Sequence, residues 1–153
     1  MPQYANTTSV SSEASRAEIE RTLRRYGADG FAYAAKAGMA MIGFTYRGKQ
    51  VRFLLPLPDI HADEYRFTPA RKTERSEKAP YDAWEQACRQ RWRALAMVVK
   101  AKLEAVECGI SEFGDEVLAH IVRPNGETGG QWMRPQLEQA YAGDTMPPLL
   151  AGF

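Results

Sequence analysis

One uninterrupted apolar stripe between residues 80 and 108 constrains the fold of this chain more than any other feature. Apolar side chains recur there every three or four residues, which is the spacing of one helix face: Tyr81, Trp84, Cys88, Trp92, Leu95, Val99, Leu103 and Val106. Pro80 suits the first helical turn and Gly109 suits the position after the last one. The predicted helix of roughly 28 residues is about 42 Å long. We therefore expect about half of its stripe to need a surface beyond a small sheet, supplied by the C-terminal helices or a second subunit.

The run before this helix has the period of a β-sheet. Residues 39–46 and 49–57 are rich in branched and aromatic side chains and flank the turn-forming pair Arg47-Gly48. A two-residue turn sets three cross-strand pairs: Tyr46 with Lys49, Phe44 with Val51, and Ile42 with Phe53. The apolar pairs among them share one face, which we expect to be buried.

The opposite face of this hairpin is predicted to be open and half polar. It carries Met41, Gly43, Thr45, Gln50, Arg52 and Leu54. A preceding strand begins near Phe31 and turns at Ala37-Gly38. Pro56 ends the sheet because proline cannot donate a hydrogen bond to a strand ladder.

Helical patterns lie on both sides of these strands. Residues 16–26 form an apolar stripe that Ser15 and Glu18 cap and Gly27 ends. After the long helix, Ser111 begins a short helix that runs to Ile121, and residues 132–142 form a last helix. Its apolar side chains are expected to pack on the body: Trp132, Leu137 and Tyr141.

The element order predicts an α+β fold. It comprises an N-terminal helix, a three-stranded antiparallel sheet, a long helix packed on the sheet, and two short C-terminal helices. We expect a mobile arm at residues 1–14 and a single domain at 15–153. That domain includes a surface loop at 59–79 and an acidic helical part at 110–153.

Charge is distributed unevenly along the chain. The net charge of the 153 residues is +1, but residues 31–102 carry +7 and residues 103–153 carry −6. Such an asymmetry suggests a surface that binds polyanions beside an acidic appendage. Basic side chains bind nucleic acid because each cation neutralises a phosphate and releases counterions.

The predicted nucleic-acid-binding residues come from three segments. They lie on the hairpin, in the loop and along one stripe of the long helix: Arg47, Lys49, Arg52, Arg66, Arg71, Lys72, Arg89, Arg93 and Lys100. For the helix stripe, a solvated helix face is an equal alternative. In the loop, Tyr65 and Phe67 flank Arg66, so these aromatic rings either stack on unpaired bases or anchor the loop to the core.

The sequence contains no catalytic signature. Nucleophile-elbow, zinc-protease, phosphate-loop and dinucleotide motifs are all missing, so we predict that the protein is not an enzyme and needs no cofactor. An acidic run with one imidazole, D-x-H-x-D-E at residues 59–64, is short of ligands and predicts no metal site. Cys88 and Cys108 lie 20 positions apart on one predicted helix, too far for a disulfide. Reduced cysteines, a polar N-terminus and the lack of a long apolar run favour a cytoplasmic protein.

Two resemblances add to these patterns. The words YANTTSV, SRAEIERTLRRYGADGF and RQRWRALAMVVKAKLEAVE resemble small proteins encoded in tailed-phage and prophage genomes. This likeness implies action in a bacterial host cytoplasm. Over residues 15–108, the order of one helix, three strands and one helix also looks like a double-stranded RNA-binding domain or the core of a phage single-strand annealing protein.

Together these features predict a phage-encoded protein that binds nucleic acid, with DNA favoured, in recombination or replication. Single-strand binding or annealing is one form of this function. The alternative is a protein–protein inhibitor of a host enzyme or defence complex. We also expect a homo-oligomer, because the positive middle and the negative end permit head-to-tail contacts.

Overall fold

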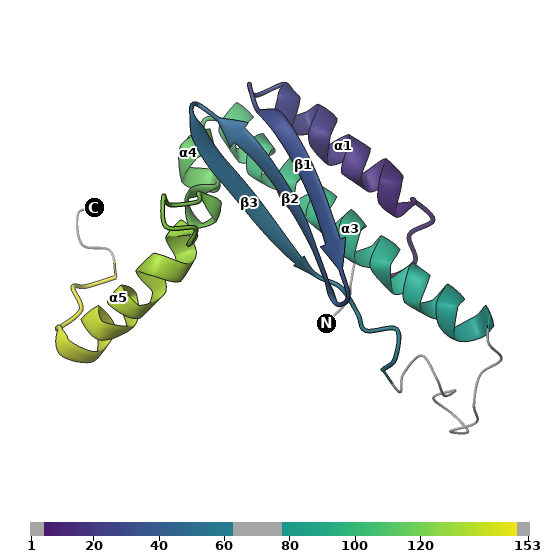
Figure 1. Cartoon of the computed structure of the whole chain (residues 1–153). Helices are drawn as coiled ribbons and strands as arrows, with labels where there is room; N and C mark the ends of the chain where they lie inside the picture. Colours follow the sequence, from purple (N-terminus) through teal and green to yellow (C-terminus); the bar gives the residue numbers. More distant parts are fainter. Residues whose placement is uncertain (1–4, 63–77, 150–153) are drawn as a thin grey trace.

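The computed structural model describes residues 5–62 and 78–149, with backbone alone for 78–80 (Figure 1). The elements are α1 (Ser12–Arg24), β1 (Asp29–Lys36), β2 (Met39–Tyr46), β3 (Lys49–Pro56), α3 (Lys78–Glu107), α4 (Phe113–Glu116), the 3₁₀ helix η1 (Leu118–His120) and α5 (Gly129–Gly143). The predicted α+β order is confirmed.

The three strands form one antiparallel sheet in the order β1-β2-β3. All three predicted hairpin pairs are present: Tyr46 with Lys49, Phe44 with Val51, and Ile42 with Phe53. The turn between them places Arg47 at φ 47° and Gly48 at φ 73°. Two positive φ angles are the geometry of a type I′ turn, whose twist matches that of the flanking strands.

Helices α1 and α3 cover the same face of the sheet, and the other face is open (Figure 1). The core lies between these two layers and contains Ile19, Leu23, Ile42, Phe44, Val51, Phe53, Trp92, Leu95, Val99 and Leu103. Because α1 packs beside α3, the stripe of α3 is buried from Cys88 to Leu103 within one chain. Most of the stripe that was expected to need a C-terminal helix or a second subunit is therefore covered by α1 and the sheet, and α4 packs against its C-terminal end.

The N-terminal segment differs from the expected pattern. Ser11, not Ser15, caps α1, and its hydroxyl accepts a hydrogen bond from the Ala14 amide. Ser15 is fully buried inside the helix. Part of the expected mobile arm lies along α3, because the Gln86 side chain donates to the Thr8 carbonyl over 2.9 Å.

The C-terminal helix α5 projects from the body at the β3 edge of the sheet (Figure 1). Its expected packing on the body is wrong: Trp132, Leu137 and Tyr141 are 45%, 51% and 70% exposed. Its packing within the described chain is mainly against η1. The single helix expected from Ser111 onward is instead split into α4 and η1, and Glu112 occupies the cap position of α4.

None of the described helices combines the length and the apolar character that crossing a bilayer requires.

Both cysteines are free thiols. Cys88 lies within α3 and is buried, whereas Cys108 directly follows α3 and is exposed. Among the described residues, no cluster of three potential metal ligands occurs. Part of the acidic run at 59–64 lies outside the described residues.

Candidate functional site

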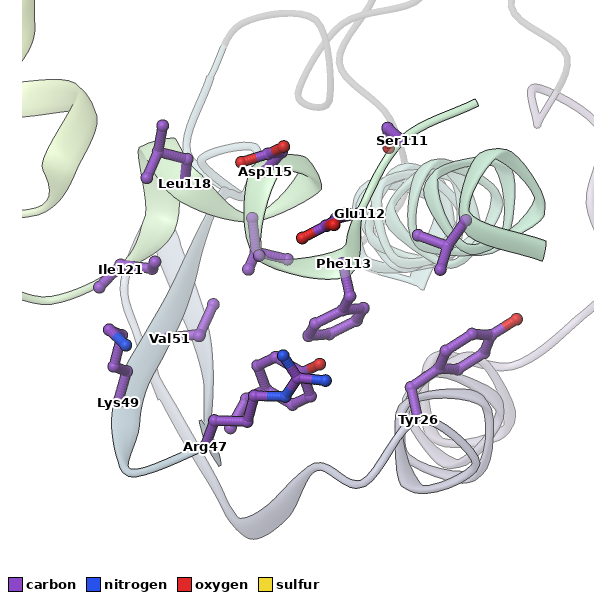
Figure 2. Close-up of a pocket in the computed structure, with 14 residues that line it drawn as sticks. Tyr26, Arg47, Lys49, Val51, Ser111, Glu112, Phe113, Asp115, Leu118 and Ile121 are labelled. Atoms are coloured by element: carbon purple, nitrogen blue, oxygen red, sulfur yellow. The ribbon is translucent and has the colours of Figure 1, made fainter. Parts of the chain in front are cut away.

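A cleft of about 710 Å³ lies where the β2–β3 turn faces α4 (Figure 2). The ends of α1 and α3 close one side of it. The lining residues are Tyr26, Tyr46, Arg47, Lys49, Val51, Val106, Ser111, Glu112, Phe113, Gly114, Asp115, Val117, Leu118 and Ile121. This volume is within the range of ordinary ligand sites, about 300–1,000 Å³.

Three aromatic rings form the inner part of the cleft. Phe113 points into it from α4 and is only 5% exposed (Figure 2). The ring of Tyr26 stacks on Phe113 with the centroids 6.0 Å apart, and the ring of Tyr46 lies tilted against it at 4.1 Å. These contacts tie α1, β2 and α4 together, so the apolar wall is ordered before any ligand binds.

Two cations lie at the rim of the cleft, on and next to the β2–β3 turn. The Arg47 guanidinium lies over the Tyr46 ring, 5.2 Å from its centroid, and reaches toward the middle of the cleft (Figure 2). Lys49 follows on β3 and is exposed. Neither cation forms an ion pair with any residue in the described part of the chain. Both charges are therefore available to an anionic ligand.

Carboxylates occupy the α4 side. Glu112 and Asp115 are exposed and lie across the cleft from the turn (Figure 2). The nearby Glu116 is not part of this wall, because it accepts a hydrogen bond from Ser111 and pairs with Lys102. The Ser111 bond holds the pKa of Glu116 below its ordinary value, and the Lys102 ammonium adds to the effect. The cleft thus has one cationic and one anionic rim.

Tyr26 stays a neutral phenol in this setting. The Glu107 carboxylate beside its hydroxyl, together with burial, raises the pKa of Tyr26 to about 12. The hydroxyl also donates to the Leu103 carbonyl over 3.3 Å. Tyr26 therefore serves as an apolar wall with its polar end held by α3.

The other predicted hairpin residue, Arg52, lies on the open sheet face. It donates to the Gly126 carbonyl over 2.9 Å and so holds the turn at residues 123–128 beside β3. Its Nε atom is buried without a hydrogen-bond partner among the described residues. Arg52 therefore does not share the surface of Arg47 and Lys49.

Two of the three basic residues in the predicted stripe on α3 form ion pairs with carboxylates of the same chain. Arg93 forms an ion pair with Glu18 of α1 at 2.6 Å, and Arg89 pairs with Glu85 at 3.5 Å. Lys100 is exposed but lines a groove of about 290 Å³ between α1 and α3 that also contains Glu104 and Glu107. The remaining predicted residues, Arg66, Arg71 and Lys72, lie outside the described residues, as do Tyr65 and Phe67.

The structure adds residues that the sequence reasoning did not assign to a site. Tyr26, Phe113, Glu112 and Asp115 come from segments far from the hairpin in sequence, and no local spacing connects them to Arg47. Their meeting depends on how the segment after α4 folds back against β3, where the Val122 amide donates to the Gln50 carbonyl over 2.8 Å.

Comparison with family models, curated proteins and solved structures finds no match to this chain.

Proposed function

We propose that the protein binds single-stranded nucleic acid at this cleft, with an unpaired base against the apolar wall and its phosphates on the turn. The observation that supports this proposal is the placement of two cations without ion pairs in the described chain, Arg47 and Lys49, at the rim of an aromatic cleft. Aromatic walls contribute about 1–3 kcal/mol per stacked base, and cations on the rim neutralise the backbone.

The two rims give the ligand an orientation. Carboxylates repel phosphates, so Glu112 and Asp115 keep the backbone on the Arg47 side. The same carboxylates accept hydrogen bonds from exocyclic amino groups, as acidic side chains do with cytosine. An unpaired base meets these requirements, whereas the bases of a duplex are stacked and cannot enter a cleft of this size.

This proposal transfers the main contact from the long helix to the hairpin. In the phage setting that the sequence resemblance implies, such binding would serve recombination or replication, with DNA as the favoured ligand. The proposed homo-oligomer would place more than one cleft along one strand.

The test is a salt titration of binding to fluorescent DNA oligonucleotides. The variant Arg47→Asn with Lys49→Gln removes both charges and keeps a residue that tolerates positive φ in the turn. The slope of log affinity against log salt should fall by about 1.4, because each single-strand phosphate contact contributes about 0.7. The matched control, Arg89→Gln with Arg93→Gln, should leave the slope unchanged.

A second measurement tests the carboxylate rim. The protein should bind oligo-dC more tightly than oligo-dT, because cytosine has an amino group where thymine has a carbonyl. Glu112→Ala with Asp115→Ala should abolish this preference, because alanine has no side-chain acceptor. Absence of binding at low salt, or a slope insensitive to the hairpin variant, would reject the proposal.

The second candidate is a protein–protein inhibitor of a host enzyme or defence complex. It is favoured by carboxylates at one end of the molecule, where Glu104 and Glu107 of α3 join Glu112 and Asp115. Such a group of charges could cover a basic site on a partner protein. Absence of nucleic-acid binding combined with capture of a basic host protein would support it.

A further inference from the structure

Two surfaces of this protein that expose apolar side chains have no partner within the described chain. One is the stripe on α5, which contains Met133, Leu137 and Tyr141 at 39%, 51% and 70% exposure. The other is the open face of the sheet. A helix with an uncovered apolar stripe, on a body with an uncovered sheet face, is typical of an interaction site.

The position of α5 is set by its first turn. A Cβ atom on Gly129 would lie 2.5 Å from the Leu118 carbonyl oxygen, so only glycine permits this close approach. The Gly129 amide donates to the Ile121 carbonyl over 2.8 Å, and Thr128 and Gln131 form a reciprocal capping box. These contacts hold α5 away from the sheet of its own chain.

The open sheet face has the shape of a receptor for such a helix. A hollow of about 350 Å³ runs over β1 and β2, with a floor of small residues at Ala32, Ala34 and Gly43. Arg52 and Val122 border it on the β3 side. Large side chains of a helix fit a floor of small ones, as facing large and small residues do in a packed core.

The dimensions of α5 match those of the open sheet face. With 15 residues, α5 is about 22 Å long. Strands of eight residues extend about 26 Å, and three of them span about 14 Å. The 15-residue helix therefore matches the length of the sheet and covers most of its width.

We propose that α5 of one copy docks on the open sheet face of a second copy, and that the exchange is reciprocal about a two-fold axis. The reciprocal exchange forms two equivalent helix–sheet contacts, so it buries twice the area of one contact and approaches the roughly 1,200–2,000 Å² of stable interfaces. A simple pair of α5 helices would bury only about half of this area. The area therefore favours helix on sheet over helix on helix.

Charge is compatible with this arrangement. The segment at residues 129–149 carries Glu138 and Asp144 against Arg134, a net charge of −1. The sheet face carries Lys36 and Arg52 against Asp29, a net charge of +1. The negative end of the α5 dipole, next to Asp144, adds to the attraction.

Light scattering on the full chain at micromolar concentration tests the dimer. We expect twice the chain mass of 17.2 kDa. Leu137→Asp on the helix and Ala34→Arg on the sheet should each reduce the mass to that of a monomer while circular dichroism stays unchanged. Val98→Asp, at a 47% exposed position on α3 outside both surfaces, is the matched control and should remain a dimer.

Cysteine cross-linking tests which surfaces meet. In a Cys108→Ser background, a mixture of Leu137→Cys and Ala34→Cys proteins should form a disulfide-linked pair, whereas Leu137→Cys alone should not. A monomer at every concentration would overturn the proposal and leave α5 for a different protein. A disulfide between two Leu137→Cys copies, or a dimer that survives Ala34→Arg, would overturn the helix-on-sheet contact.

Discussion

Arg93 of α3 donates a hydrogen bond to Glu18 of α1 over 2.6 Å, and this ion pair joins the two helices that cover the sheet. Both side chains are about 30% exposed. Arg93, which the sequence pattern predicted as a phosphate-binding residue, is thus paired with a carboxylate of its own chain. Arg93 is paired within the protein, whereas Arg47 and Lys49 at the cleft rim form no ion pair among the described residues. For this reason the proposed binding site lies at the hairpin.

Replacing Arg93 tests the strength of this pair. Arg93→Gln should lower the free energy of unfolding by about 1 kcal/mol, the upper range for partly exposed ion pairs. In urea unfolding, a double-mutant cycle with Glu18→Gln should show a favourable coupling. The same cycle on the exposed Arg16–Glu13 pair should show none. Equal coupling in both cycles would mean that the helix–helix pair has no special role.

The turn at the cleft rim depends on a glycine. Gly48 has φ 73°, and a Cβ atom added there would meet no other atom within 4 Å, so Gly48→Ala would introduce backbone strain without a clash. We expect a loss of about 1 kcal/mol in unfolding free energy. Gly114→Ala on α4 is the control, because Gly114 has open space and no positive φ. It should change stability little, and a comparable loss there would contradict the strain argument.

His120 makes stability depend on pH. Its ring lies 4.2 Å from that of Phe53, and burial holds the pKa of His120 below its ordinary 6.5, with the Lys102 charge adding to the effect. As pH falls through about 6.5, the unfolded chain takes up the proton first. Stability should therefore decrease from pH 6.5 toward the folded pKa and level off below it.

Thermal melting between about pH 4.5 and 7.5 measures this effect. His120→Gln should remove this part of the pH dependence. The exposed His61 serves as the control, and His61→Gln should leave the profile unchanged. A profile that His120→Gln does not alter would place its origin in other groups.

Removing the projecting helix should leave the body folded. A chain that ends at Gln131 loses side chains that are mostly exposed, so its cooperative melting should change by only a few degrees at low concentration. A chain that ends at Gly109 also loses Phe113 and Val117 from the core and should be strongly destabilised. Loss of cooperative melting in the chain that ends at Gln131 would show that α5 belongs to the core.

Local patterns predicted the backbone of this protein well. The period-two run around Arg47-Gly48 predicted the hairpin register, because a shift by one residue would turn Phe44 and Val51 out of the core. The stripe ending at Gly109 predicted α3 to within about two residues at each end. Such features depend on neighbours in sequence, and their physical causes are local sterics and the period of burial.

The sequence predicted the candidate site only in part. Arg47 and Lys49 were predicted as binding residues and lie at the rim, but the aromatic and acidic walls come largely from the end of α1 and from α4, which no spacing connects to the hairpin. The capping serine was misplaced because Ser11 and Ser15 both stand before helical residues, and burial against the core selected between them.

By itself the sequence determined the order of the main helices and strands and the register of the hairpin, because these depend on contacts a few residues apart. Tertiary structure alone decided which cations are paired, which rings line the cleft, and that α5 stands clear of the sheet. Ion pairs such as Arg93 with Glu18 join residues 75 positions apart, and the approach of Gly129 to Leu118 depends on one close backbone contact. Such long-range geometry follows from how whole elements pack, since side-chain charge and hydrophobicity specify a preference for burial or pairing but not the partner.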